Sequence, residues 1–202
     1  MVEGRWALVH PQPQDAERIA GLVAEAMAED PLQRYLFPPA AAEAERTLFR
    51  LVAAYGIRQG NLLATSRNLE GVAFWQTPQD RSWVGVAPVL REGLRLLAQG
   101  GASGVARLVR ASAYTFRRHH RHAPFPHWYL GLLAVRPRHQ GRGFASLLLH
   151  PVLASLEREH LPCYLETNTP QNVSLYRHFG FRVVEESVIP GTPVRLWCLL
   201  KK

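Results

Sequence analysis

Lysine is almost absent from this chain of 202 residues. The only two lysines, Lys201 and Lys202, are its last two residues. The 24 basic residues outnumber the 16 acidic ones, so arginine supplies nearly all of a formal net charge of +8. Such a bias is typical of a GC-rich genome, and a basic surface for a partner is the alternative interpretation. We do not expect a nucleic-acid partner.

Cysteines and long apolar runs are also scarce. Only Cys163 and Cys198 are present, each in an apolar strand-like run, which excludes a disulfide framework and is typical of a reducing compartment. The longest uncharged apolar run has about eight residues, whereas a membrane-spanning helix needs ~20. The N-terminal segment has no apolar stretch typical of a signal peptide. We therefore expect a cytoplasmic protein with no membrane partner.

Hydrophobic periodicity predicts a mixture of helices and strands. Before residue 79 we expect a strand at 5–10, a helix at 15–27, a loop at 29–39, a helix around 48–55 and a hairpin over 61–76. After residue 79 we expect helices near 86–98 and 103–118, a strand at 128–135, a helix at 143–160, a strand at 163–168, a helix at 172–179 and strands at 181–189 and 194–200. A strand, a crossover helix and a strand imply a parallel pair.

The connection between strand 128–135 and the following helix combines basic side chains with two glycines. Backbone N–H groups at a helix start attract an anion, and Gly141 and Gly143 lack the Cβ atoms that would keep it at a distance. Positive charge is added around the same point by Arg138, His139 and Arg142. The segment predicts a phosphate-like ligand, and a plain turn with solvated arginines is the alternative.

Two common phosphate motifs fit poorly. A Walker loop needs a Gly-Lys-Ser/Thr sequence, and no lysine is present here. Residues 141–146 nearly meet the dinucleotide fingerprint, with Glu166 roughly where a ribose-binding acid would stand. However, the first glycine lies too far from the end of the strand for a tight turn. Too little chain also follows Glu166 to complete a doubly wound sheet.

Residues 135–145, VRPRHQGRGFA, resemble the pyrophosphate-binding motif of the GCN5-related N-acetyltransferases (GNAT), Gln/Arg-x-x-Gly-x-Gly/Ala, at Gln140, Gly143 and Ala145. Residues 172–181, NVSLYRHFGF, resemble the same family's N-x-x-x-Y-x-x-x-G-F segment at matching spacing. Within the family, the C-terminal half is most similar to the puromycin N-acetyltransferases. Residues 79–126 carry little that can be matched.

The resemblance implies an α/β (α+β) fold of the GNAT type. Its central sheet would be mixed and mostly antiparallel, with about seven strands, helices on both faces and a helical insertion before the fourth strand. One N-acetyltransferase domain would then cover residues 1–202. Within it, residues 79–126 would be the helical insertion and residues 127–200 the acetyl-CoA-binding half.

Acetyl-CoA is the co-substrate that the resemblance implies, and no metal is expected. Its pyrophosphate would lie on the glycine loop, and its pantetheine arm along strand 128–135, where the parallel strands of this family splay apart. The residues expected to bind it are Leu133, Ala134, Val135, Gln140, Gly141, Arg142, Gly143, Phe144, Ala145 and Asn172.

Two residues are expected to perform the catalysis. The resemblance implies that Tyr176 donates a proton to the departing thiolate, and a core tyrosine is the alternative. Period two places Glu166 on one strand face with Tyr164 and Asn168, where a charge is costly unless it is paired or functional. Glu166 is therefore either the general base or a structural group, and His127 is a second candidate base.

The acceptor is expected to be a primary amine of a small molecule, contacted by Asp30, Tyr35, Phe37 and Trp75. Tryptophan in a strand is more often a core residue than a pocket residue, so this role of Trp75 has an alternative. The run RRHHRH at 117–122 predicts a solvated helix end rather than a metal site, because adjacent helical positions point in different directions.

Two other classes of function compete with a small-molecule N-acetyltransferase. One is a peptide or protein N-acetyltransferase, which an open acidic groove would favour. The other is a non-catalytic module that senses acetyl-CoA or binds nucleic acid. The sequence indicates neither the identity of the amine nor the oligomeric state.

Overall fold

The computed structural model describes residues 8–79 and 86–202, and it describes only the backbone of 86–97 and of residue 100. The helices are α1 (Ala16–Met27), α2 (Pro31–Leu36), α3 (Ala42–Gln59), α4 (Val86–His122), α5 (Phe144–Arg158) and α6 (Pro170–His178), with 3₁₀ turns at Pro13–Asp15 (η1), Pro39–Ala41 (η2) and Pro137–His139 (η3). The strands are β1 (Leu62–Ala64), β2 (Gly71–Gln76), β3 (Trp128–Val135), β4 (Cys163–Thr167), β5 (Arg182–Val188) and β6 (Arg195–Lys201).

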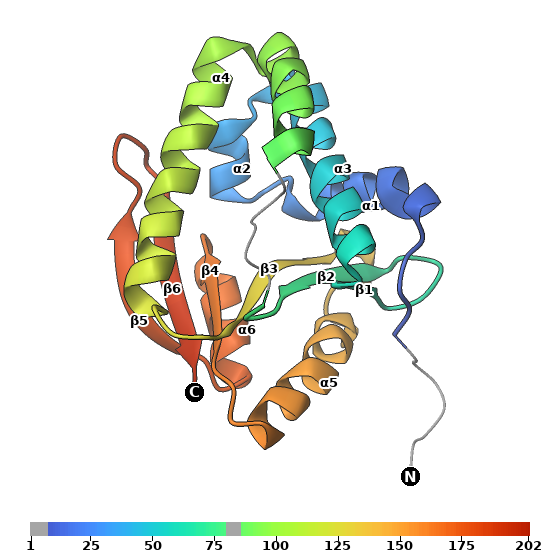
Figure 1. Cartoon of the computed structure of the whole chain (residues 1–202), viewed down its shortest axis with the longest axis vertical. Coiled ribbons are helices and arrows are strands. Elements are labelled where there is room, and N and C mark those ends of the chain that lie inside the picture. The colour runs from blue at the N-terminus through green and yellow to red at the C-terminus, as the bar shows by residue number, and fades with distance from the viewer. Residues whose placement is uncertain (1–7, 80–85) are drawn as a thin grey trace.

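The six strands form one sheet in the order β1-β2-β3-β4-β6-β5 (Figure 1). All neighbouring strands are antiparallel except β3 and β4, which are parallel as expected for a strand–helix–strand crossover. These two strands pair only through Trp128 with Cys163 and Tyr129 with Tyr164. Beyond those pairs β3 and β4 diverge, which opens a gap in the middle of the sheet.

An irregularity in β3 accompanies this divergence. Phe74 of β2 pairs with Leu132, whereas the next residue, Trp75, pairs with Leu130. Gly131 is therefore an extra residue in β3, that is, a β-bulge, and it is exposed. Bulges bend a strand and increase its twist, so the bulge lies where β3 turns away from β4.

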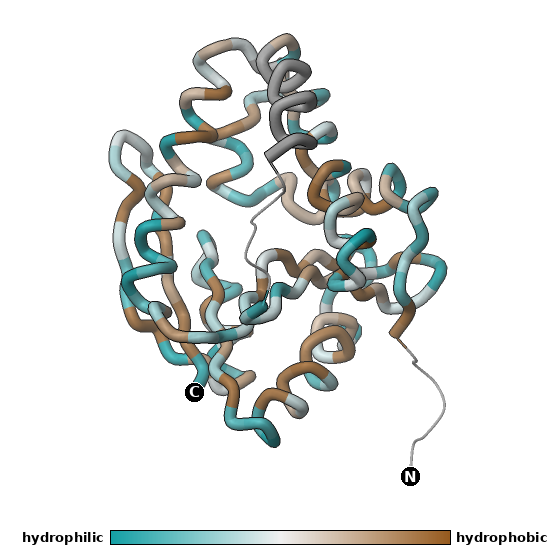
Figure 2. Tube along the Cα trace, viewed as in Figure 1, coloured by the Kyte–Doolittle hydropathy of each residue, from teal (hydrophilic) through white to brown (hydrophobic). Residues whose placement is uncertain are grey.

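Three apolar clusters fix helices to both faces of the sheet. Residues such as Leu148 and Phe181 join α5 and α6 to one face. On the opposite face, α1 and α3 cover β1 and β2 through residues such as Ile19, while α2 and the C-terminal half of α4 cover β4 and β6 around Tyr164. Figure 2 shows apolar residues concentrated in the strands and α5. The predicted fold class, with helices on both faces, is confirmed.

The sheet has six strands, where the sequence predicted about seven. Of the first predicted strand, residues 5–7 lie outside the described residues, and Val9 makes a single bridge to Ala64. The loop predicted at 29–39 was wrong, because it contains α2. Asp30 caps that helix by accepting hydrogen bonds from the backbone N–H groups of Leu32 and Gln33. Asp followed by proline is a helix-start signal.

The two helices predicted in the insertion are present and form the two arms of α4, which is kinked at Gly101 (φ 66°, ψ 169°). The predicted solvated end of the second helix was wrong in part. Arg118 and His122 pair with Glu185 on β5, so two of the six residues in the RRHHRH run are docked onto the sheet. Within the described ranges, no helix combines the length and the apolarity of a membrane-crossing segment.

Candidate active site

The gap between β3 and β4 is open to two different layers of the molecule. The face carrying α5 and α6 holds Leu130 and Cys163, which border the gap from that side. The face carrying α2 and α4 holds Tyr129 and Tyr164, the last pair before the strands separate. Past this pair, β3 has a neighbour only on its β2 side. A ligand in the gap can therefore hydrogen-bond to strand backbone and meet groups from both faces.

One end of the gap leads to the glycine loop. Gly141 and Gly143 have positive φ angles of 72° and 84°, and no atom lies within 4 Å of where a Cβ would stand at either. Gly143 is the N-cap of α5, and no side chain caps that helix. Uncapped N–H groups facing open space are what a phosphate group requires. The loop therefore fits the pyrophosphate of acetyl-CoA.

Side chains around the loop hold its shape and supply positive charge. Gln140 donates a hydrogen bond from Nε2 to the carbonyl oxygen of Val135 (3.1 Å), which closes the loop onto the end of β3. Arg138 and Arg142 are exposed and both contact His139. Neither arginine has a carboxylate partner among the described residues, so their charge is available to an anion.

The other expected cofactor residues lie along the same path. Leu133, Ala134 and Val135 form the end of β3, and the Val135 carbonyl is the one that Gln140 already engages. Phe144 is buried and anchors the start of α5, while Ala145 is half-buried. Asn172 lies one turn before Tyr176 on α6, and its backbone N–H is bound by the capping hydroxyl of Thr169. Their contacts with a co-substrate stay predictions.

Tyr176 belongs to the apolar cluster on the α5–α6 face. Its ring packs edge-on against Phe181, with centroids 5.9 Å apart, and only 6% of the residue is exposed. Burial raises the pKa of this phenol above its ordinary 10.0, with a smaller contribution from the nearby Cys163 thiol. Tyr176 therefore keeps its proton throughout the neutral range, in the cluster that also contains Leu130 of β3 and Cys163 of β4.

Glu166 lies on the opposite face, in a cluster that the sequence indicated only in part. The hydroxyl of Tyr129 donates a hydrogen bond to its Oε2 (2.8 Å), while its Oε1 is buried and has no hydrogen-bond partner among the described residues. Burial raises the pKa of this carboxyl from 4.5 to about 7, although the neighbouring hydroxyls of Tyr129 and Tyr164 oppose the shift. Tyr129 was not among the predicted site residues, because only the strand register shows that it faces Glu166.

Of the four expected acceptor residues, two lie on the Glu166 face. Tyr35 and Phe37, at the end of α2, pack against the cluster that contains Tyr164. Asp30 has another task as the cap of α2, and burial raises its pKa despite its two backbone hydrogen bonds. Trp75 is 2% exposed in the core under α5, with its ring against Trp128, which supports the alternative interpretation of a core residue.

His127, the second candidate base, is already engaged. Its Nδ1 lies 2.6 Å from the carbonyl oxygen of Phe125, and burial lowers its pKa. The part of the chain that the structure describes contains no group of three or more His, Cys, Asp or Glu side chains arranged to hold a metal ion. Glu166 is therefore the carboxylate that faces the gap with a pKa near neutrality.

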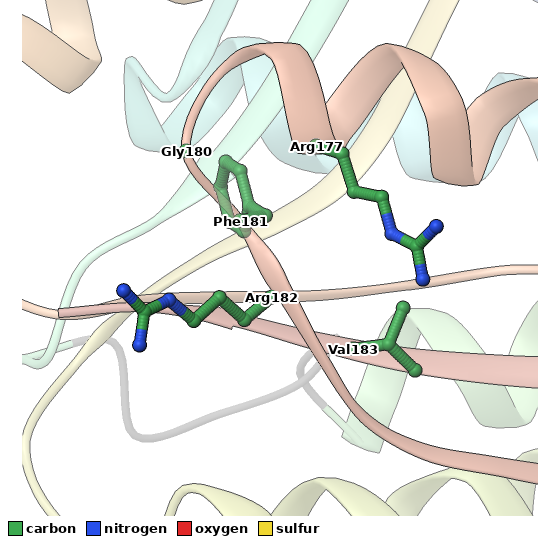
Figure 3. Close-up of a pocket in the computed structure, with 5 residues that line it drawn as sticks. All are labelled: Arg177, Gly180, Phe181, Arg182 and Val183. Carbon is green, nitrogen blue, oxygen red and sulfur yellow. The ribbon is translucent and has the colours of Figure 1, made fainter.

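A surface hollow elsewhere does not resemble a reaction site. It is lined by Arg177, Gly180, Phe181, Arg182 and Val183, where α6 ends and β5 begins. Figure 3 shows the guanidinium groups of Arg177 and Arg182 extending in different directions, so they do not converge on one anion. The hollow gathers neither a carboxylate nor a nucleophile.

The sheet splits between two parallel strands, and an uncapped helix start suited to a phosphate group lies at the end of the gap. Residues 63–181, more than half of the chain, match the acetyltransferase (GNAT) family, and the chain belongs to that family. It is accordingly an acyltransferase, as the sequence resemblance predicted. GNAT enzymes use acetyl-CoA, which the loop described above fits.

Similar proteins agree with this assignment. An uncharacterized N-acetyltransferase of Schizosaccharomyces pombe is 26% identical over 192 residues, covering 88% of this chain and 74% of the relative. A crystal structure of a histone acetyltransferase HPA2-related protein from Corynebacterium glutamicum matches with a TM-score of 0.68 at 21% identity, covering 98% and 96% of the two chains. A polyamine N-acetyltransferase of Drosophila melanogaster matches with a TM-score of 0.63 at 13% identity, covering 97% and 99%.

Proposed function

We propose that this chain transfers an acetyl group from acetyl-CoA to the primary amine of a small molecule, with Glu166 as general base and Tyr176 as general acid. The observation that carries the proposal is their arrangement: they lie on opposite faces of the sheet, each in a cluster that includes residues of the two diverging strands β3 and β4. The carboxyl with a pKa of about 7 is on the acceptor face, and the phenol with a raised pKa is on the cofactor face.

The bound co-substrate supplies an acetyl thioester whose carbonyl carbon is open to attack. Glu166 accepts a proton from the incoming ammonium group, which frees the nitrogen lone pair to form the new C–N bond. A base with a pKa near the working pH is the most effective one for this step. Tyr176 donates its proton to the sulfur as the C–S bond breaks, and the second proton lost by the nitrogen as the amide forms restores the tyrosine hydroxyl. The products are an amide and a free thiol, with one proton released to solvent.

The acceptor face favours a compact amine. Its described walls are aromatic, from Tyr35, Phe37 and Tyr129, and Glu166 supplies a single negative charge. A cation is stabilised both by a carboxylate and by aromatic faces. The named activity of one structural neighbour, formation of N-acetylagmatine, belongs to the same class of acceptor. A peptide or protein acceptor would be favoured by an open acidic groove, whereas the described residues on this face supply one carboxylate among aromatic rings.

The same proposal includes the organisation of the chain. A single domain would bind both substrates, with residues 127–200 binding the co-substrate and the C-terminal half of α4 covering the acceptor face. The two buried free thiols support a reducing, cytoplasmic setting. The similarity to the puromycin N-acetyltransferases stays a prediction. Supplying puromycin as an acceptor tests it.

A thiol-release assay tests the reaction. The protein is supplied with acetyl-CoA and a panel that includes agmatine, spermidine, an arylalkylamine, puromycin and a lysine-containing peptide. We expect amine-dependent release of CoA with at least one of the small amines and none with the peptide. The Glu166→Gln variant should lose most of this activity below pH 7 and regain part of it at alkaline pH, where more of the amine is already neutral. Peptide acetylation in preference to every small amine would overturn the proposal.

A further inference from the structure

A histidine with no part in the proposed reaction packs against the groups that hold Glu166. The ring of His119, on α4, stacks on Tyr164 with centroids 4.6 Å apart and an interplanar angle of 26°. The same ring lies 4.5 Å from the ring of Tyr129 at 38°. Tyr129 donates the hydrogen bond to Oε2 of Glu166, and Tyr164 shares a strand face with that carboxylate. His119 therefore touches both aromatic neighbours of the base.

Hydrogen bonding fixes the orientation of this ring. The Phe125 carbonyl oxygen only accepts, so we assign the proton of His127 to Nδ1, which lies 2.6 Å from it. Nε2 of neutral His127 then carries a lone pair, and Nε2 of His119, 2.6 Å away, must be the donor. Burial, aided by the neighbouring imidazole of His127, lowers the pKa of His119 to about 3, so the pair is neutral at neutral pH.

We propose that His119 is a positioning residue for Glu166: anchored by His127, its ring clamps Tyr129 and Tyr164 so that the carboxylate keeps one oxygen on Tyr129 and presents the other to the amine. The inference rests on the proposed function of Glu166. A clamped cluster also excludes water from the carboxylate, and exclusion of water raises the pKa of an acid.

Among the titratable groups around Glu166, the carboxyl of Glu166 itself is the one that changes charge near pH 7. The groups that face it are Tyr129 from β3, Tyr164 from β4 and Cys198 from β6. His119 from α4 packs behind the two tyrosines, and His127 and His120 contact His119. Burial raises the pKa of Cys198 to about 12 and that of both tyrosines well above 10. None of these three groups therefore titrates near pH 7.

Two substitutions are expected to move the acid limb of the kcat/KM profile in opposite directions. His119→Ala opens space for water beside Glu166, so the pKa of the base falls from about 7 towards its ordinary 4.5 and the limb moves down by about one pH unit or more. Tyr129→Phe removes a hydrogen bond that favours the charged carboxylate, so the limb moves up. His119→Phe keeps a stacking ring and should leave the limb near its wild-type position.

Arg117→Ala is the matched control, because Arg117 lies on the same helix and is exposed. It should change neither the limb nor kcat. CoA affinity and melting temperature, measured for every variant, separate a shifted base from a misfolded protein. If the alanine variant does not fold, His119→Leu keeps the volume without the aromatic ring and replaces it in the comparison.

A direct titration separates this inference from the proposed function. The carboxyl carbon of Glu166 is followed by ¹³C NMR in glutamate-labelled protein, with Glu166→Gln as the assignment control. If Glu166→Gln retains wild-type activity, the assignment of the base is wrong, yet the NMR titration still reports on the clamp. An unchanged Glu166 midpoint in His119→Ala would overturn the inference. An equal shift in His119→Phe would also overturn it, because the stacking ring would then have no role.

Discussion

The loop that opens α5 makes Gly143→Asp a demanding test of the cofactor site. Gly143 has a φ of 84°, and a new Cβ there would meet no atom within 4 Å. The substitution therefore costs backbone strain alone, about 1–2 kcal/mol. In a protein of this size each kcal/mol lowers the melting temperature by roughly 2–4 °C, which leaves the variant folded at 25 °C.

The new charge acts on the ligand rather than on the fold. A carboxylate about 5 Å from a pyrophosphate charge repels it by about 1–3 kcal/mol, for effective dielectric constants between about 80 and 20. Since 1.4 kcal/mol corresponds to a factor of ten, the dissociation constant for CoA should rise by roughly 5- to 150-fold. Arg142→Ala removes only one exposed side chain and should produce a smaller loss.

Isothermal titration calorimetry with CoA measures these affinities, and Gly60→Asp is the matched control. Gly60 ends α3 with a φ of 72° and also has open space at its Cβ position, but it lies outside the loop. The control should lose similar stability and bind CoA as the wild type does. If Gly143→Asp and Gly60→Asp bind CoA equally well, the phosphate site is not at this loop.

Three further predictions concern the chemistry, the cysteines and the docked end of α4. Tyr176→Phe should lower kcat by roughly 10²–10⁴-fold in the thiol-release assay with CoA affinity almost unchanged, and a wild-type kcat would exclude it as the acid. Cys163 and Cys198 face opposite sides of the sheet, so mass spectrometry after unfolding without reductant should show both alkylated, whereas a mass lower by two hydrogens would contradict this. Burial alone would raise the pKa of Glu185, but His122 and Arg118 outweigh burial and lower this pKa below 4.5. The pairing therefore stabilises the folded protein above pH 4.5, and this stabilisation is lost as the pH falls through the lowered pKa. In urea unfolding, Glu185→Gln should therefore cost about 1–3 kcal/mol at pH 7 and progressively less towards pH 3, and an equal cost at both pH values would refute the pairing.

The cofactor half could be predicted from the sequence because its signals are local. The apolar run of β3, the two glycines and the amphipathic α5 follow one another, so the loop that joins them has little choice of geometry. The spacing of Asn172 and Tyr176 likewise fixes one helical face. Each of these inferences needs only neighbours within about one helical turn or one strand.

The acceptor half depends on contacts between distant residues. Arg118 and Glu185 are far apart in the sequence, so nothing local shows that the end of α4 is docked. All six residues of β2 are buried, so no alternation shows which face Trp75 occupies. Tyr129 and Glu166 come together only through the register of β3 on β4. Asp30 is different, since its cap was readable from the proline that follows it.

The two residue pairs between β3 and β4 also make the sheet two mechanical halves joined at a narrow seam. Strands β1 to β3 form one half and β4 to β6 the other, and the facing backbone amides past Tyr129 lack a strand neighbour. This lack of a neighbour holds among the described strands, and amides without such partners exchange with deuterium quickly. A ligand in the seam would bond to both halves, so it would act as the missing strand and slow this exchange. The exchange rate of these amides then reports whether the co-substrate is bound, and the measurement does not require the amine to be identified.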